Sequence, residues 1–181
     1  EILLTNIGLN PERTGILDIL LEMGADITIA NRREVSGEPM GDIRVRSAPL
    51  RGTTIGPQLI PKTIDELPIL FVAAALADGE TRITGAQELR VKETDRIRAM
   101  ATELARLHVE VEEQPDGLVI KGKSAIRGAS CLSYGDHRVV MSLAICGLRA
   151  DSPVTIDDVE CVETSFPGFK DKLLDLLTNS K

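Results

Sequence analysis

Two stretches of the chain are apolar at almost every position, residues 65–77 and 136–148. Runs of this length suit helices, and a helix that is hydrophobic all round is a buried one. Each run opens on an aspartate, Asp65 or Asp136, and aspartate is a favoured N-cap residue. We therefore predict two inner helices in which Asp65 and Asp136 occupy equivalent N-cap positions.

Three further stretches repeat apolar residues at helical spacing, which predicts outer helices with one face inward. The first follows Asn10 and Pro11, which suit an N-cap and the first helical position. The second starts in a charged cluster and runs to Leu107, and the third follows the start signals Ser165 and Pro167. The predicted inward residues are Ile16, Ile19, Leu20 and Met23 in the first helix, Ile97, Met100, Ala101, Leu104 and Leu107 in the second, and Phe169, Leu173 and Leu176 in the third.

Short runs of strand-forming residues flank the outer helices. A single strand is predicted before each outer helix, and a strand pair after each of the first two. The single strands are residues 2–5, 81–84 and 154–156, and the pairs are 26–30 with 43–46 and 109–112 with 118–121. The repeating unit is thus helix, strand, helix, strand and strand, an α/β fold with inner helices packed against sheets. Because the first copy lacks its opening helix and the third its closing strands, we expect the chain to be part of a larger array.

The composition is that of an ordinary globular domain. With 181 residues the chain is long enough for one core, and 43% hydrophobic against 27% charged residues is a normal balance. A formal net charge of -7 disfavours nucleic acid and anionic membranes as partners, because such binding is built from clustered cations. The sequence shows no apolar run of membrane-spanning length and no basic segment typical of a secretory signal. We expect a cytoplasmic protein.

The cysteines and histidines form no metal or redox motif. Cys131, Cys146 and Cys161 are too far apart for a CxxC pattern, and their odd number argues against a complete disulfide framework. We expect them to be buried thiols. The two histidines, His108 and His137, belong to no metal-binding pattern, so no protein-bound catalytic metal is predicted.

The most distinctive segment is the charged cluster that opens the second outer helix. Lys92 and Arg96 stand four apart, which would place both cations on one helical face with Glu93 beside them. Such a group can hold a phosphate while the carboxylate moves a proton, and Arg90 and Arg98 add to the positive field. The same spacing also fits a surface helix with ion pairs, because structural networks imitate functional sites.

A second motif is a formal match only. The run from Gly117 to Ser124 satisfies the phosphate-loop pattern G-x-x-x-x-G-K-[ST], which requires a flexible loop between a strand and a helix. Here Leu118, Val119 and Ile120 are strong strand formers, and the residues after Ser124 carry little helical signal. We interpret Gly117 as the last residue of a hairpin turn formed with Pro115 and Asp116.

Three motifs carry a family resemblance. They are Glu-Leu-Arg-Val-Lys-Glu-Thr-Asp-Arg from Glu88, Ile-Asp-Glu-Leu-Pro from Ile64, and Asp-His-Arg from Asp136. Through them the chain closely resembles the 5-enolpyruvylshikimate-3-phosphate synthases, over a span from about Asn6 to Phe169. The resemblance implies two domains, each of three such units, which close on substrate in the cleft between them. Residues 1–181 would then be a single domain, most of the C-terminal one, and the first domain is absent from this chain.

The reaction implied by the resemblance transfers the enolpyruvyl group of phosphoenolpyruvate to the 5-hydroxyl of shikimate 3-phosphate and releases phosphate, in aromatic amino acid biosynthesis. Its partners would be these two substrates and the missing N-terminal domain, with no metal or organic cofactor. Because one wall of the cleft is missing, the chain alone is expected to be inactive. Two alternatives remain: a UDP-N-acetylglucosamine enolpyruvyl transferase, against which the run from Lys92 to Arg96 argues, and a non-catalytic half that acts as an interaction module.

The resemblance also assigns roles to matching positions. Asp65 matches the proton acceptor at the shikimate hydroxyl, and Lys92 matches the lysine beside that hydroxyl. Glu93 matches the glutamate that transfers a proton at the methylene carbon of phosphoenolpyruvate. Arg96 and Arg138 match arginines that grip the phosphate and carboxylate of phosphoenolpyruvate. The set is chemically coherent, because the reaction needs a base for oxygen, an acid for carbon and cations for charged oxygens.

Two positions leave alternatives open. His137, in the Asp-His-Arg motif, either hydrogen-bonds substrate or serves a structural role at the helix entry. Many family members carry a lysine just before Ser/Thr-Phe-Pro, as a further contact to phosphoenolpyruvate, where this chain has Thr164. The chain resembles a second branch with Thr-Ser-Phe-Pro, so one phosphate contact is in question.

Overall fold

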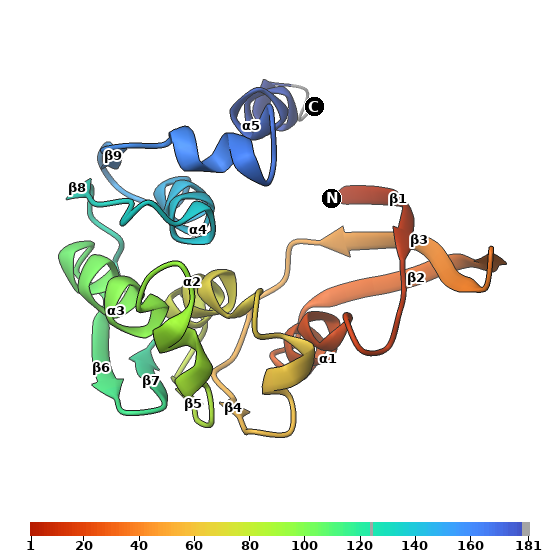
Figure 1. Ribbon diagram of the computed structural model, residues 1–181, viewed down its shortest axis with the longest axis horizontal. Helices are drawn as coiled ribbons and strands as arrows, with labels where there is room; N and C mark the ends of the chain where they lie inside the picture. The colour runs from red at the N-terminus through yellow and green to blue at the C-terminus, as the bar shows by residue number, and fades with distance from the viewer. Residues whose placement is uncertain (124, 179–181) are drawn as a thin grey trace.

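The computed structural model describes residues 1–123 and 125–178. Figure 1 shows two parts: a sheet of three strands with helix α1 beside it, and a larger body that holds the remaining helices and strands. Within the described ranges, no helix combines the length and apolar character needed to cross a membrane. The same ranges contain no group of three or more histidine, cysteine or acidic side chains placed to hold a metal ion.

The elements follow the predicted repeat. The first copy holds β1 (Ile2–Gly8), α1 (Gly15–Glu22), β2 (Asp26–Val35) and β3 (Glu38–Arg46). The second, complete copy holds α2 (Leu67–Leu76), β5 (Glu80–Ile83), α3 (Arg96–Arg106), β6 (Glu110–Gln114) and β7 (Gly117–Lys121), with β4 (Thr54–Ile55) and the 3-10 helices η1 (Ile60–Lys62) and η2 (Gln87–Val91) as additions. The third holds β8 (Ser130–Cys131), α4 (His137–Gly147), β9 (Thr155–Ile156), the 3-10 helix η3 (Glu160–Thr164) and α5 (Phe169–Thr178).

The sheets confirm the predicted strand pairs. In the first sheet, of order β1-β3-β2, all neighbours are antiparallel, and Ile27 and Ile29 face Val45 and Ile43 across the ladder. In the second, of order β4-β5-β7-β6, the pairing of β6 with β7 is antiparallel around the predicted turn, while β4 joins β5 in parallel. A short parallel pair, β8 with β9, completes the set.

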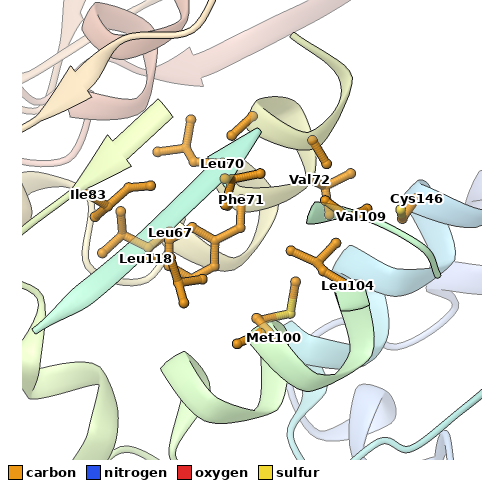
Figure 2. Close-up of a cluster of buried hydrophobic side chains, with 14 of the residues drawn as sticks. Leu67, Leu70, Phe71, Val72, Ile83, Met100, Leu104, Val109, Leu118 and Cys146 are labelled. Atoms are coloured by element: carbon orange, nitrogen blue, oxygen red, sulfur yellow. The ribbon is translucent and has the colours of Figure 1, made fainter. Parts of the chain in front are cut away.

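Helix α2 lies at the centre of the main core, as its apolar sequence predicts. Leu67 and Phe71 are fully buried and pack with Ile83, Leu104 and Leu118 from the surrounding strands and helix (Figure 2). The second inner helix, α4, is less enclosed than predicted. Its one side is buried in the core, whereas its other side lines hollows toward α5 and stays partly exposed.

Three local predictions are wrong. Helix α1 begins at Gly15 and not after Pro11, because the Asn10 side chain accepts a hydrogen bond from the Glu12 amide at 2.9 Å and so stabilises a separate turn. Leu176 of α5, predicted to face inward, is 47% exposed, and α5 has no buried residue among those described. Asp65 does not cap α2: Glu66 holds the N-cap position without a side-chain bond.

The phosphate-loop match is a strand, as the sequence predicts. Gly117 opens β7, which pairs with both β5 and β6, so its backbone is committed to a sheet. A Cβ atom at Gly117 would collide with the backbone of Ile83, which explains the glycine without any ligand. Ser124, the last residue of the match, lies outside the described residues.

Candidate active site

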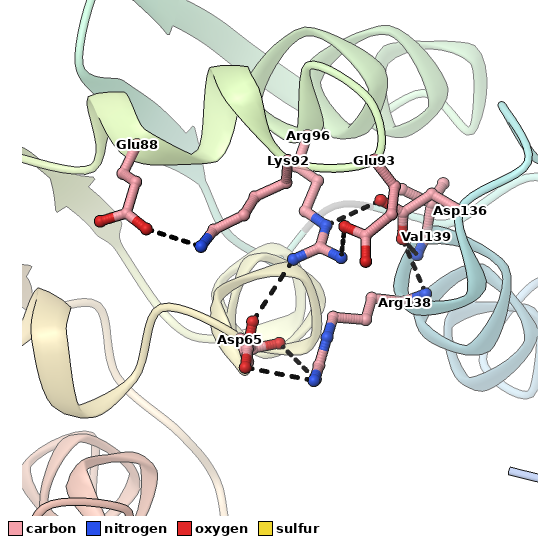
Figure 3. A network of polar contacts seen from close by, with 8 residues as sticks. All are labelled: Asp65, Glu88, Lys92, Glu93, Arg96, Asp136, Arg138 and Val139. Atoms are coloured by element: carbon pink, nitrogen blue, oxygen red, sulfur yellow. Dashed lines mark hydrogen bonds and ion pairs between the residues drawn. The ribbon is translucent and has the colours of Figure 1, made fainter. Parts of the chain in front are cut away.

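A buried guanidinium is the centre of the site. Arg96, the first residue of α3, is 1% exposed and is surrounded by carboxylates from three segments (Figure 3). Its Nε donates to Asp136 Oδ2 at 2.7 Å and its Nη2 to Glu93 Oε2 at 2.6 Å, while Nη1 lies 3.5 Å from Asp65 Oδ1. The structure therefore brings three carboxylates to Arg96, and two of them, Asp65 and Asp136, are far from it in the sequence.

One nitrogen of Arg96 is left without a hydrogen bond. Among the described residues, Nη1 is the one buried side-chain polar atom that has no hydrogen-bond partner, since its contact with Asp65 is longer than a hydrogen bond. Buried donors are nearly always satisfied, because an unmade bond loses the hydration that the group had in water. A guanidinium donor that lacks a hydrogen bond is suited to an anionic oxygen.

Asp136 does two things at once. As predicted, it caps α4: its Oδ1 accepts from the backbone amides of Arg138 at 2.9 Å and Val139 at 3.3 Å. Its other oxygen, Oδ2, holds Arg96 Nε, which the sequence analysis did not anticipate. Asp136 is fully buried and has lost its hydration in water. Its hydrogen bonds from the α4 amides and from the Arg96 guanidinium compensate for that loss.

Asp65 connects the two arginines. It lies just before α2, and its two carboxylate oxygens face Arg96 on one side and Arg138 on the other, with Arg138 Nη2 at 3.3 Å from Oδ2. Arg138 Nη1 also donates to the backbone carbonyl of Asp65 at 2.9 Å. The side chains of Asp65 and Arg138 are 28% and 29% exposed, so both are open to a ligand.

A pocket of about 220 Å³ opens beside Asp65 and Arg138, between α2, α4 and Phe169 at the start of α5. Glu66 also lines it, a residue to which the sequence analysis gave no role. Burial raises the pKa of Glu66, and the neighbouring Asp65 adds to the rise, although Arg138 opposes it. The hollow thus combines an apolar floor with titratable groups at its mouth.

The predicted helical face of Lys92 and Arg96 does not exist. The charged cluster folds as η2, which ends at Val91, and Lys92 has an extended backbone before α3 starts at Arg96. Lys92 Nζ pairs with Glu88 Oε1 at 2.6 Å, and Figure 3 shows this pair beside the carboxylates around Arg96. The side chain of Glu93 is half-exposed, so its carboxylate is open to a ligand.

The remaining cations of the cluster do not widen the positive field. Arg90 is used to tie η2 to the β6–β7 hairpin: it donates to the carbonyls of Gln114 and Pro115, each at 2.7 Å, and pairs with Asp95 and Glu113. The side chain of Arg98 is 70% exposed, and its Nε lies 3.6 Å from Glu113 Oε1. Both are structural or surface residues here.

The last two predicted positions do not join this network. His137 is the first residue of α4, next to Asp136, and its ring has no hydrogen-bond partner among the described residues. Its role in substrate binding stays a prediction. Thr164 donates to the Cys161 carbonyl at 2.7 Å, a local contact of η3.

The fold is that of an enolpyruvyl transferase domain. The enolpyruvyl transferase NikO from Streptomyces tendae has the same fold: its structure covers 96% of this chain with a TM-score of 0.69 at 19% identity, over 38% of its own length. A family model described as EPSP synthase (3-phosphoshikimate 1-carboxyvinyltransferase) matches residues 1–173. The chain belongs to the EPSP synthase family, which confirms the resemblance seen in the sequence.

Individual relatives agree with the family. The 3-phosphoshikimate 1-carboxyvinyltransferase of Alkaliphilus metalliredigens is 52% identical over 167 residues, which are 92% of this chain and 39% of the relative. The solved EPSP synthase of Acinetobacter baumannii is 42% identical with a TM-score of 0.92, over 96% of this chain and 41% of its own. The chain therefore spans about two fifths of the length of these relatives.

Proposed function

We propose that this chain is most of the C-terminal domain of a two-domain 3-phosphoshikimate 1-carboxyvinyltransferase and forms one wall of its active site. The carrying observation is the buried Arg96: its Nε and Nη2 are hydrogen-bonded to Asp136 and Glu93, whereas its Nη1, 3.5 Å from Asp65, has no hydrogen bond and can take an anionic oxygen. The enzyme would transfer the enolpyruvyl group of phosphoenolpyruvate to the 5-hydroxyl of shikimate 3-phosphate and release phosphate.

The two arginines are assigned to phosphoenolpyruvate. The contacts of Arg96 Nε with Asp136 and of Nη2 with Glu93 fix the plane of the guanidinium, so the Nη1 donor that lacks a hydrogen bond has one direction. Arg138 lies on the other side of Asp65 and is more exposed, which suits the second anionic group of the same substrate. The phosphate or carboxylate of an incoming substrate would replace part of the contact between Asp65 and the two arginines. The Asp65 carboxylate would then be free to act.

The carboxylates are assigned to the proton transfers. Asp65 takes the proton of the 5-hydroxyl while the hydroxyl oxygen bonds to C2 of phosphoenolpyruvate. Glu93 gives a proton to C3, which becomes a methyl group. In the second half, a proton leaves C3, the C2–O bond to phosphate breaks, and the enol ether and free phosphate remain. Lys92 supports the developing charge at the 5-oxygen of shikimate 3-phosphate, and His137 is a further candidate for contact with substrate.

Family membership favours shikimate 3-phosphate over a nucleotide sugar as the acceptor. The half-exposed Cys161 and the buried Cys131 and Cys146 are free thiols, as suits the cytoplasmic location that we propose. The interaction-module alternative remains: it predicts binding to the other half of the enzyme without chemistry.

A chimera tests the proposal. The matched segment of the Alkaliphilus metalliredigens relative is replaced by this chain, and phosphate release is measured with phosphoenolpyruvate and shikimate 3-phosphate. We expect release that depends on both substrates and is absent when UDP-N-acetylglucosamine replaces shikimate 3-phosphate. The chain alone should release none, because its site lacks the opposite wall that excludes water. A folded chimera that binds both substrates and releases no phosphate would refute the catalytic assignment.

A further inference from the structure

Helix α3 carries two buried charges on one face. Arg96 and Glu103 stand seven residues apart, two turns of helix, and are 1% and 0% exposed. The rest of that face is apolar, with Met100 and Leu104 fully buried beside them. A buried carboxylate costs much free energy unless it is paired, so the contacts of Glu103 are informative.

Glu103 holds the segment that leads into α4. Its Oε1 accepts from the Tyr134 hydroxyl at 2.8 Å, and its Oε2 accepts from the Leu132 amide at 3.3 Å and lies 3.1 Å from Arg106 Nε. Desolvation and the hydrogen bond to Glu103 raise the pKa of Tyr134 to about 12. The carboxylate thus grips both the backbone and the side chain of this segment.

The segment needs such a hold. Tyr134 and Gly135 both have left-handed backbone, with φ of +55° and +66°, in a tight turn closed by the Asp136 amide and the Ser133 carbonyl at 3.1 Å. A left-handed conformation is strained for tyrosine, because its Cβ crowds the carbonyl that follows. Outside contacts must therefore stabilise this turn, and the residue that follows it is Asp136.

Helix α3 thus contacts the same segment at both ends. Glu103 binds its beginning, at Leu132 and Tyr134, and Arg96 binds its end, at Asp136 Oδ2. Because both contacts come from one rigid helix face, a shift of Tyr134 would be passed on to Asp136 two residues later. Asp136 in turn sets the plane of Arg96.

We propose that Glu103 and Tyr134 are positioning residues for the phosphoenolpyruvate site, which fix the turn so that Asp136 aims Arg96 at the substrate. This rests on the proposed function. Neither residue touches substrate; they act through Asp136. Their loss should therefore weaken the use of phosphoenolpyruvate and leave the use of shikimate 3-phosphate nearly unchanged.

The kinetic test uses the active chimera with Tyr134→Phe, which keeps the ring and removes one hydroxyl, and with Glu103→Gln. We expect the KM for phosphoenolpyruvate to rise on the order of tenfold, since small misplacements of a binding group are costly, with the KM for shikimate 3-phosphate within about twofold. Thr155→Val is the matched control: it removes an exposed side-chain bond to Ser130 on β8 and β9. It should change neither constant.

A double-mutant cycle tests the route. If Tyr134 acts through Asp136, then Tyr134→Phe should add little to the KM change of Asp136→Asn, whereas independent effects would multiply. Should Tyr134→Phe and Glu103→Gln lower only the melting temperature and leave both KM values unchanged, the pair is structural and the inference is wrong. Glu103→Gln risks misfolding, and the isosteric Tyr134→Phe then decides alone.

A spectroscopic readout separates this inference from the proposed function. In the 181-residue chain, the Arg96 Nε–H proton is bonded to buried Asp136 and should exchange slowly with water in NMR spectra. Tyr134→Phe should speed that exchange on the order of tenfold, and Thr155→Val should not. If the parent chimera releases no phosphate, the function fails while this measurement still decides the positioning. Unchanged exchange in Tyr134→Phe would overturn the inference.

Discussion

Arg96 and Asp136 lie 40 residues apart in the chain, yet Nε of the arginine donates to Oδ2 of the aspartate at 2.7 Å with both residues buried. The bond joins the first turn of α3 to the N-cap of α4. Helix N-termini favour anions through their free amides. The contact therefore brings a guanidinium and two helix N-termini to one point, which is the physical basis of the candidate site.

Arg96→Ala should damage both activity and folding. The substitution removes the donor that we propose for phosphoenolpyruvate and also leaves Asp136 buried without its cation. Breaking a buried pair by removing one partner costs about 3–5 kcal/mol. We expect urea denaturation to show a loss of that size, together with a higher KM for phosphoenolpyruvate in the chimera. Arg98→Ala is the control on the same helix, and as an exposed residue it should change the free energy of unfolding by less than about 0.5 kcal/mol. Equal effects of the two substitutions would contradict the central place of Arg96.

Glu93→Gln should act on turnover. The amide keeps the shape of the side chain but cannot relay a proton to carbon, so kcat should fall on the order of 10²-fold if proton transfer is limiting. Because the side chain is 51% exposed, melting temperature should change little. Stopped-time phosphate assays beside thermal melts measure both quantities, with Glu112→Gln on β6 as control. Normal kcat in Glu93→Gln would remove this residue from the proton pathway.

Asp65→Asn should also lower kcat, because the amide cannot accept the hydroxyl proton. Since Asp65 does not cap α2, its loss should not unravel the start of that helix. The variant leaves Arg96 and Arg138 with fewer contacts, so a modest rise in phosphoenolpyruvate affinity is expected with the fall in kcat. Calorimetric titration of phosphoenolpyruvate into the chimera, beside steady-state rates, measures the two effects. A variant with unchanged kcat and weaker folding would mark Asp65 as structural.

The ionisation of Tyr134 can be measured directly. It is the only tyrosine of the chain, which has no tryptophan, so absorbance near 295 nm reports this residue alone. We expect a native pKa of about 12, against about 10 in the unfolded chain. Because the folded pKa is the higher one, this group contributes stability that is fully present below about pH 10 and is lost as pH rises toward 12.

Two comparisons check that result. Glu103→Gln should bring the native midpoint of Tyr134 toward the unfolded one, because the hydrogen-bonded carboxylate is one of the causes of the rise. Tyr134→Phe should remove part of the alkaline loss of stability between about pH 10 and 12. A native midpoint near 10 in the parent chain would mean that the Glu103 contact is absent in solution.

Much of the fold follows from the sequence alone, because it depends on local periodicity. The mostly apolar run at 65–77 became the central helix α2, and the strand-forming runs at 26–30 and 43–46 became part of the antiparallel pair of β2 and β3. Asp136 caps α4 as its position predicted. Capping and pairing need only neighbouring residues and turn chemistry, so single-sequence patterns contain them.

The site depended on tertiary structure. Lys92 and Arg96 look like helix neighbours in the sequence, yet η2 ends at Val91, the backbone of Lys92 is extended, and α3 starts only at Arg96. Asp65 looks like a cap, yet its carboxylate lies between two arginines from α3 and α4. One sequence signal could have indicated a second buried charge on this helix. Glu103 stands seven positions, or two helical turns, after Arg96 and next to Leu104 of the predicted apolar face. The sequence determined which charges the chain carries and which helices it forms. Only the packing of α2, α3 and α4 decided which buried charges meet, because an ion pair across 40 residues depends on the distance between elements and not on their spacing along the chain.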